Sequence, residues 1–191
     1  MMNKPNNYDN TTTASFERVQ IGPHVAVIKG VEETQSKAGR DMIVVSIDFA
    51  KEDEQGGYFT TVFDNDTRDD KKWPFQATHY ILTTDANGNT SRSFKAFCTS
   101  FEESNNVKIK WGDDFAKQFK GKKIGVMFGE VEEEYNGQVN MRTRIRWFFD
   151  QHKIDTQTAP LPKLLYKEAA ASTDNGDWMN VPNGQEALPF A

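Results

Sequence analysis

Apolar and polar residues alternate with a period of two in several short stretches of the first third of the chain. The strongest alternation covers residues 41–49, where every second residue is apolar. A β-branched stretch at 24–31 precedes it, and an aromatic and β-branched stretch at 58–63 follows it after a Gly-containing turn. We therefore predict a three-stranded antiparallel meander, with 58–63 as its third strand. The residues expected on the buried face of the second strand are Ile43, Val45, Ile47 and Phe49.

The period changes to that of a helix between residues 91 and 104. Its apolar positions are spaced i, i+3, i+4, i+7 and form one stripe, and Ser91 or Ser93 could cap its first turn. The residues of that stripe are Phe94, Phe97, Cys98 and Phe101. A second, shorter helix is expected at 113–119. Two strands, 122–133 and 138–149, then flank Asn136-Gly137, a pair typical of tight hairpin turns.

Three strands, a helix and a two-stranded hairpin follow one another in the order found in an OB-fold barrel. We predict a mainly β domain over residues 16–150, built as a five-stranded OB-fold-like antiparallel barrel with a helix between strands 3 and 4. A generic α+β domain has a comparable number of elements and stays open as an alternative. Residues 1–15 contain four Asn and three Thr and are expected to form a flexible arm. Residues 151–191 are expected to form a flexible acidic tail.

Composition narrows the class of protein. The 191 residues are 37% hydrophobic and 12% aromatic, which supplies one ordinary core and excludes a chain disordered throughout. A net charge of −5 excludes a strongly basic protein that coats duplex DNA. No apolar run approaches the roughly 18 residues of a membrane span. The first residues lack the apolar core of a secretory signal, and Cys98 has no second cysteine to pair with, so we expect a cytoplasmic protein without membrane association.

The charge is unevenly distributed. Residues 168–191 hold four acids and no Lys or Arg, so −4 of the net charge of −5 lies in this segment and −1 in residues 1–167. An acidic tail on a nearly neutral body indicates two separate tasks, or a tail that screens a binding surface of the body.

The sequence lacks the usual signatures of an enzyme. It contains no Gly-rich phosphate-binding motif and no nucleophile elbow. Its three histidines lie far apart and, with one cysteine, offer no zinc-ligand spacing. The aspartates of residues 64–70 begin like a calcium loop, but Arg68 occupies a ligand position. We predict no catalytic residue, no metal and no cofactor, and a nuclease built on Asp64, Asp66, Asp69 and Asp70 is the least favoured class.

Three arginines alternate along the last predicted strand. Arg142, Arg144 and Arg146 would share one strand face at a spacing of about 7 Å, which suits the phosphates of an extended nucleic-acid strand. The alternative is a solvated face on which acids across the hairpin neutralise the arginines. The acids considered for that role are Glu130, Glu132 and Glu134.

Further basic residues occur beside aromatic residues in predicted loops. A single nucleic-acid strand needs cations for its phosphates and flat rings for its exposed bases. Besides the arginines, the candidates for nucleic-acid binding are Lys37, Arg40, Tyr58, Lys71, Lys72, Trp73 and Tyr135. Two basic–aromatic clusters place lysines beside a tryptophan, Lys71–Phe75 and Lys108–Trp111.

The chain ends in an apolar tip after its acidic segment. Leu188, Pro189 and Phe190 suit docking into a small apolar pocket with a basic rim, and the proline limits the conformations lost on binding.

The barrel-like order over 16–150 and the tip together resemble single-stranded-DNA-binding proteins of phages and prophages of Gram-positive bacteria. That resemblance implies sequence-nonspecific binding of single-stranded DNA in phage DNA replication or recombination, in the cytoplasm of a bacterial host. It also implies that the tip recruits replication or recombination proteins. The chain departs from the family pattern because Ala191 follows Phe190 and only Glu186 is acidic among the last seven residues.

Three alternatives stay open. The same barrel could be a protein-interaction module, either an adaptor or a phage-encoded inhibitor of a host protein, that binds no DNA. The nucleic acid could be DNA or RNA, because stacking and phosphate neutralisation serve both. The barrel could also form a homo-oligomer through its strand edges.

Overall fold

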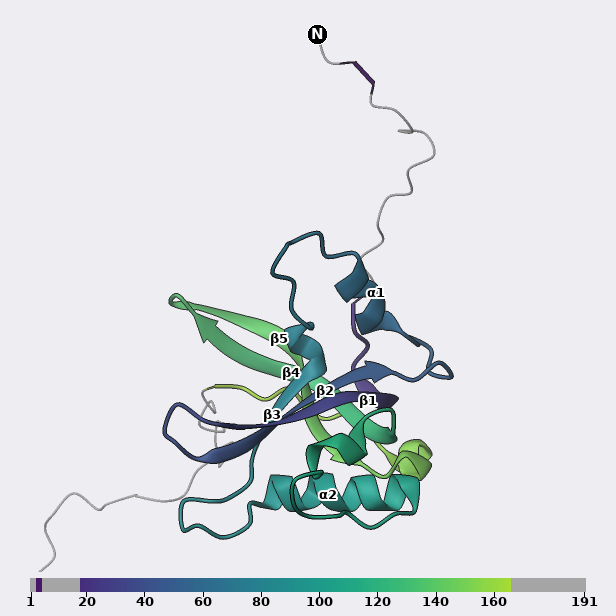
Figure 1. Cartoon of the computed structure of the whole chain (residues 1–191). Coiled ribbons are helices and arrows are strands. Elements are labelled where there is room, and N and C mark those ends of the chain that lie inside the picture. The colour runs from purple at the N-terminus through teal and green to yellow at the C-terminus, as the bar shows by residue number, and fades with distance from the viewer. Residues whose placement is uncertain (1–2, 5–17, 166–191) are drawn as a thin grey trace, which may run out of the picture.

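The computed structural model describes residues 3–4 and 18–165, and it contains one five-stranded antiparallel sheet with the strand order β3-β2-β1-β4-β5 (Figure 1). The strands are β1 Gly22–Gln35, β2 Asp41–Phe49, β3 Thr78–Leu82, β4 Lys123–Tyr135 and β5 Gln138–Phe149. The helices are α1 Tyr58–Asp64 and α2 Arg92–Asn105, with short 3-10 helices η2 Phe75–Ala77, η3 Ala116–Phe119 and η4 Gln151–Thr156. The predicted arm at 1–15 and the tail from residue 166 lie almost wholly outside the described residues.

Where the apolar period was long and regular, the prediction is confirmed. β2 has the predicted bounds, and its four predicted core residues are buried. Helix α2 begins after Ser91, whose hydroxyl accepts the backbone N–H of Phe94 at 3.1 Å, and its apolar stripe is buried. The β4–β5 hairpin turns through Asn136 and Gly137, whose positive φ angles of 52° and 74° are those of the predicted tight turn. The expected helix at 113–119 is shorter, a 3-10 turn at Ala116–Phe119.

The predicted third strand is wrong: residues 58–63 form helix α1, and the third strand is β3. The cause is a tertiary contact. Buried Asp48, near the end of β2, accepts the backbone N–H of Phe59 at 2.9 Å and the hydroxyl of Thr60, and so satisfies donors of the first helical turn. Gly57 starts the helix in a left-handed conformation with φ 74°. The β-branched and aromatic composition of α1 therefore indicated the wrong element.

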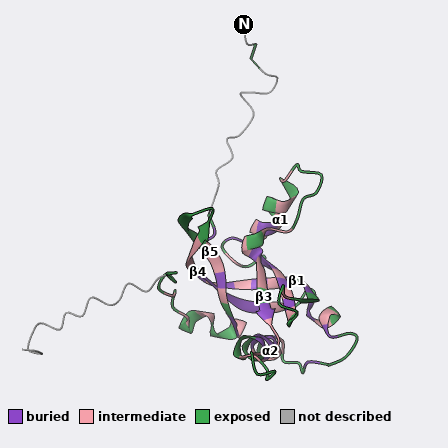
Figure 2. Ribbon diagram, turned by 90° about the vertical axis from the view of Figure 1, so that its left-hand side faces the viewer, coloured by how far each residue is buried: buried purple, intermediate pink, exposed green. Residues whose placement is uncertain are grey.

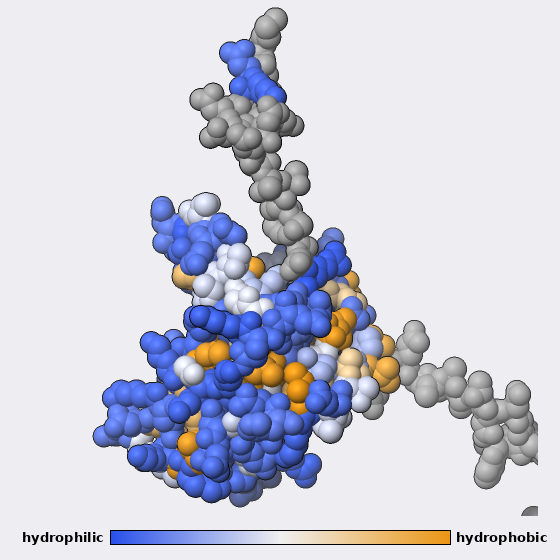
Figure 3. Space-filling model, turned by 90° about the vertical axis from the view of Figure 1, so that its right-hand side faces the viewer, coloured by the Kyte–Doolittle hydropathy of each residue, from blue (hydrophilic) through white to orange (hydrophobic). Residues whose placement is uncertain are grey.

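The core lies between the inner face of the sheet and helix α2, which packs across its lower end in Figure 1. On the face of the molecule shown in Figure 3, hydrophilic residues predominate and hydrophobic residues form patches among them. The core is rich in aromatic rings, among which Phe101 and Phe119 meet at 4.5 Å between centroids. Close packing also extends to the outer face of β4. A Cβ on Gly125 would lie 2.5 Å from a ring carbon of Phe149, so only glycine fits there.

The sheet curls so that its two outermost strands approach each other. The ring of His79 on β3 meets the ring of Phe148 on β5 edge-on at 5.6 Å. Beyond the start of β3, the guanidinium carbon of Arg144 on β5 lies 4.6 Å from the ring centroid of Phe75 in η2. β3 and β5 are therefore joined through side chains rather than through a backbone ladder.

Residues 151–165, which the sequence assigned to the tail, are held against the sheet. Lys163 forms a parallel bridge with Val131 of β4, donating its N–H to Glu130 at 2.9 Å and accepting the N–H of Glu132 at 2.8 Å. This segment follows an edge of β4 that lies beyond the reach of β1, whose pairing with β4 ends at Phe128. None of the helices in the described part of the chain has the length and apolar character that a membrane crossing requires.

Candidate nucleic-acid interface

Four aromatic side chains from β3 and from the connection between β2 and β3 lie beside one another, and we call them the aromatic strip: Phe63, Trp73, Phe75 and Tyr80. They form two pairs, Phe63 with Trp73 at 5.5 Å and Phe75 with Tyr80 at 6.1 Å between ring centroids. Only Pro74 separates Trp73 from Phe75 in the chain, so the two pairs lie close together.

Local structure fixes one part of the strip and leaves the other exposed. The indole N–H of Trp73 donates to the carbonyl of Ile47 at 3.1 Å, and the ring is half-buried against the core. Tyr80 pairs with Val44 across β2 and β3, on the face opposite to the buried pair Ile43 and Ile81. Phe75 and Tyr80 are 57% and 49% exposed, so their rings are accessible from solvent.

Cations lie over three rings of the strip. The ammonium of Lys29 is 5.4 Å from the Trp73 ring centroid, and that of Lys71 is 4.6 Å from Phe63. Arg144 covers Phe75 as described above. Positive charge and flat apolar surface therefore alternate across this side of the sheet.

The structure gives the three arginines of β5 three different environments. Arg142 is exposed, and among the described residues it has no hydrogen-bond or ion-pair partner. Arg144 forms a two-pronged ion pair with Glu133 at 2.7 Å and 2.6 Å. Arg146 donates to the carbonyls of Glu130 at 3.2 Å and Leu161 at 3.1 Å and so holds the 157–165 segment. The three arginines therefore differ in how far their charge is available to a ligand.

The acid that neutralises an arginine is also different from those considered in the sequence. Arg142 pairs with Val131 and Arg144 with Gly129 across the hairpin. The side chains of positions 130, 132 and 134 on β4 therefore face the other side, together with those of positions 143, 141 and 139 on β5. The acids at the even positions are thus separated from the arginines by the sheet, and Glu133 takes the role.

The hairpin candidates flank the strip at a distance. Lys37 and Arg40 are exposed in the turn between β1 and β2, and Tyr135 is 75% exposed at the end of β4. Arg40 precedes Val44, the partner of Tyr80, by four residues, which is about 14 Å along β2. Both hairpins project toward the left in Figure 1, and the exposed end of the β4–β5 hairpin is visible in Figure 2.

Of the remaining candidates, Lys71 and Lys72 are exposed beside the strip, whereas Tyr58 packs inward. Its ring lies 5.1 Å from that of buried Phe59. Lys108, part of the second lysine cluster, pairs with Glu102 at 3.1 Å. The predicted docking residues Leu188, Pro189 and Phe190 lie outside the described residues.

Sequence reasoning missed four residues of this surface: Lys29, Phe63, Phe75 and Tyr80. Phe75 belonged to the basic–aromatic cluster 71–75, which was the available signal. Tyr80 carries no such signal, because the sequence pattern predicts the third strand at 58–63 and no strand at 78–82.

Among the described residues, Asp66, Cys98 and His79 have pKa values well away from their ordinary values. A hydrogen bond from Arg68 is the main cause that lowers the pKa of Asp66 to about 2. Burial raises the pKa of the Cys98 thiol to about 11 and lowers that of His79 to about 4. Within residues 3–4 and 18–165, no three His, Cys, Asp or Glu side chains gather in a way that could hold a metal ion.

Comparison with known proteins adds a family. A family model described as "Protein of unknown function (DUF669)" matches residues 6–160. No curated protein matches the chain. Because the matched range covers most of the sequence, including every strand described above, the chain belongs to the DUF669 family.

Proposed function

We propose that this protein binds single-stranded DNA without sequence preference and without catalysing a reaction, in phage DNA replication or recombination. The observation that carries the proposal is the aromatic strip with its cations. Bases of a single strand expose flat faces that stack on aromatic rings, whereas bases of a duplex stack on one another. Lysine and arginine beside such rings neutralise the adjoining phosphates.

We further propose that the domain is an OB-fold barrel. The strand order, the position of α2 between β3 and β4, and the approach of β3 to β5 support this. OB-folds bind oligonucleotides across strands 2 and 3, between the 1–2 and 4–5 loops. The strip lies beside those strands, while Lys37, Arg40 and Tyr135 belong to the flanking hairpins.

Different side chains stack on the bases and neutralise the phosphates in this proposal. Phe75 and Tyr80 stack on bases, because their rings are the most exposed of the strip. Arg142, Lys71 and Lys72 neutralise phosphates. Arg144 is held by Glu133, so it positions the Phe75 ring and contributes little net charge.

The test is fluorescence anisotropy of a labelled oligo-dT titrated with the full chain, with duplex DNA of equal length as the comparison. Replacing Phe75 and Tyr80 together by alanine is expected to weaken binding on the order of tenfold or more, since each stacked base contributes about 1–3 kcal/mol. Trp111→Ala is the matched control, because Trp111 is an exposed aromatic residue that does not belong to the strip. Equal affinity of the double variant and the parent would overturn the proposal, and oligo-rU measures the preference for DNA over RNA.

A protein-interaction module is the second candidate. Leu161, Leu164 and Leu165 are 85%, 46% and 46% exposed on the segment bound to β4, and several exposed apolar side chains gathered in one short segment suit contact with a protein. This candidate replaces DNA binding if two results are found together. The full chain does not bind oligo-dT, and deletion of residues 188–191 abolishes its binding to a replication or recombination protein of the host. If both activities are present, the tip recruits partners to DNA.

A further inference from the structure

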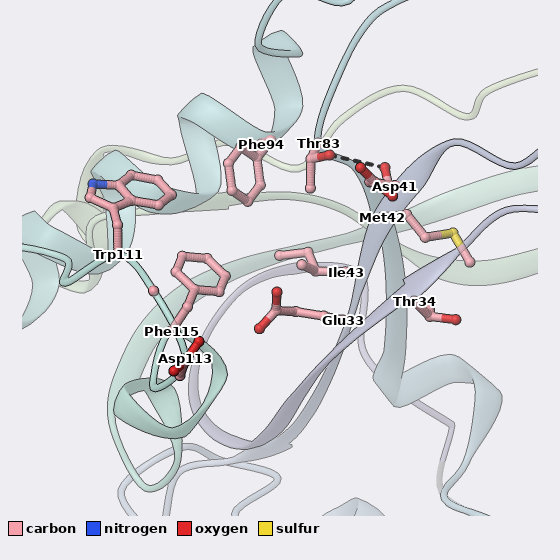
Figure 4. Close-up of a pocket in the computed structure, with 11 residues that line it drawn as sticks. Glu33, Thr34, Asp41, Met42, Ile43, Thr83, Phe94, Trp111, Asp113 and Phe115 are labelled. Atoms are coloured by element: carbon pink, nitrogen blue, oxygen red, sulfur yellow. Dashed lines mark hydrogen bonds between the residues drawn. The ribbon is translucent and has the colours of Figure 1, made fainter.

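A separate cavity of about 650 Å³ opens at the end of β2 that is remote from Trp73 (Figure 4). Trp111, Phe94 and Phe115 line one side of it, and Ile43 and Glu33 line the other. Trp111 is 70% exposed and lies nearly parallel to the Phe115 ring, with 12° between their planes and 5.3 Å between centroids. Few tryptophans in folded proteins expose so much surface without a partner to cover it.

The charge of the cavity selects a cation. Its lining contains three carboxylates, of Glu33, Asp41 and Asp113, and no Lys, Arg or His. Asp41 accepts a hydrogen bond from Gln35 at 3.1 Å, while Glu33 and Asp113 have no polar partner among the described residues. Phosphate would be repelled here, so Trp111 is not suited to the nucleic-acid role that its neighbouring lysines suggested. Aromatic faces with carboxylates favour a guanidinium or ammonium group.

The strand beside the cavity has an open edge. β1 pairs with β4 only from Gly22 to Val27, and Ile28 adds two backbone bonds to residues 121 and 122. From Gly30 to Gln35, β1 is hydrogen bonded to β2 alone in the part of the chain that the structure describes. Unpaired N–H and C=O groups along such an edge accept an extended peptide as an added strand.

We propose that an extended segment of a partner protein pairs with β1 at residues 30–35 and inserts an arginine or lysine side chain into the Trp111 cavity. The open edge supplies backbone hydrogen bonds, the indole and the Phe115 ring cover the aliphatic stem, and Glu33 and Asp113 meet the charged end. This site goes beyond the proposed DNA binding and uses none of its residues.

The probe is the capped peptide acetyl-Val-Thr-Arg-Thr-Val-amide, titrated into the ¹⁵N-labelled full chain. The indole N–H signal of Trp111, assigned with the Trp111→Phe variant, should shift saturably with a dissociation constant in the millimolar range. Backbone amides of residues 30–35 should become protected from exchange. A peptide with citrulline, which keeps the shape of arginine but carries no charge, should bind about fivefold more weakly.

Matched variants locate the interaction. Glu33→Gln and Asp113→Asn should each weaken binding about fivefold, while Glu54→Gln, which removes an exposed acid elsewhere, should leave it unchanged. Unchanged far-ultraviolet circular dichroism shows that the variants are folded.

Five results would overturn the proposal. Two concern the peptide: no Trp111 shift when it is added, or equal binding of the citrulline peptide. Two concern other ligands: tighter binding of tetramethylammonium than of the peptide, or a Trp111 shift on adding oligo-dT. A fifth is a Trp111 shift that depends on protein concentration alone, which assigns the edge to a second copy of this chain. The readouts with the peptide do not depend on whether the chain binds DNA, so failure of the proposed DNA binding leaves them unchanged.

Discussion

The burial of His79 leads to a specific prediction of how the free energy of unfolding depends on pH. It lies on β3 opposite buried Val45, with its ring against Phe148, where β3 approaches β5. No acidic side chain among the described residues is within hydrogen-bonding distance of it. Burial therefore disfavours the charged imidazolium and lowers the pKa of His79 from an ordinary value of 6.5 to about 4.

The sign follows from the unfolded chain, where His79 binds a proton more readily than in the folded protein. Well above pH 6.5 His79 is neutral in both the folded and the unfolded chain, so it does not make the free energy of unfolding depend on pH. The free energy of unfolding falls as the pH decreases from 6.5 toward the folded pKa of about 4. Between pH 7 and pH 5 the free energy of unfolding should decrease by about 2 kcal/mol from this group. The full loss, reached below pH 4, is about 3 kcal/mol.

The assay is urea denaturation of the parent and of His79→Leu at pH 7 and pH 5, followed by circular dichroism. The loss between the two pH values should be about 2 kcal/mol smaller in the variant, whatever its stability at pH 7. His79→Gln serves if leucine perturbs packing, and His152→Gln is the control because His152 is exposed on η4. An equal loss of stability in parent and His79 variants would refute the reasoning.

The other predictions concern packing, charge and reactivity. Gly125→Ala should lower the free energy of unfolding by about 1–3 kcal/mol, because its Cβ would overlap a neighbouring ring. The control Gly30→Ala meets no atom within 4 Å and should lower it by less than about 1 kcal/mol. Urea denaturation measures both values, and equal losses would contradict the packing argument. Arg142→Ala should reduce the slope of log affinity for oligo-dT against log salt concentration by about one. Arg144→Ala should weaken binding but leave that slope nearly unchanged, because Glu133 already balances the charge of Arg144. The reverse result would assign the phosphate contact to Arg144. The buried thiol of Cys98 has a pKa of about 11, so it should resist alkylation at pH 8 in the folded chain and react after unfolding. Mass spectrometry measures the fraction that is alkylated. Rapid alkylation of the folded chain would contradict the burial of Cys98.

Local pattern was sufficient for the elements that bury one regular face. The alternation in 41–49, the helical stripe of 91–104 with its serine cap, and the Asn-Gly turn each specify backbone geometry through neighbouring residues, and the structure has them in place. The surface arginines and lysines were likewise evident from the sequence, because their charge does not depend on the fold.

Tertiary structure decided what those charges face. The register of β4 and β5 joined Arg144 to Glu133, and the buried carboxylate of Asp48 made a helix from a stretch that resembled a strand. Displacing the third strand to 78–82 brought Tyr80 beside Phe75, a meeting that no local period encodes. Composition and period determine which residues can be buried or charged, whereas contacts between residues distant in the chain depend on the cooperative packing of the whole sheet, and these contacts set the partners of each side chain.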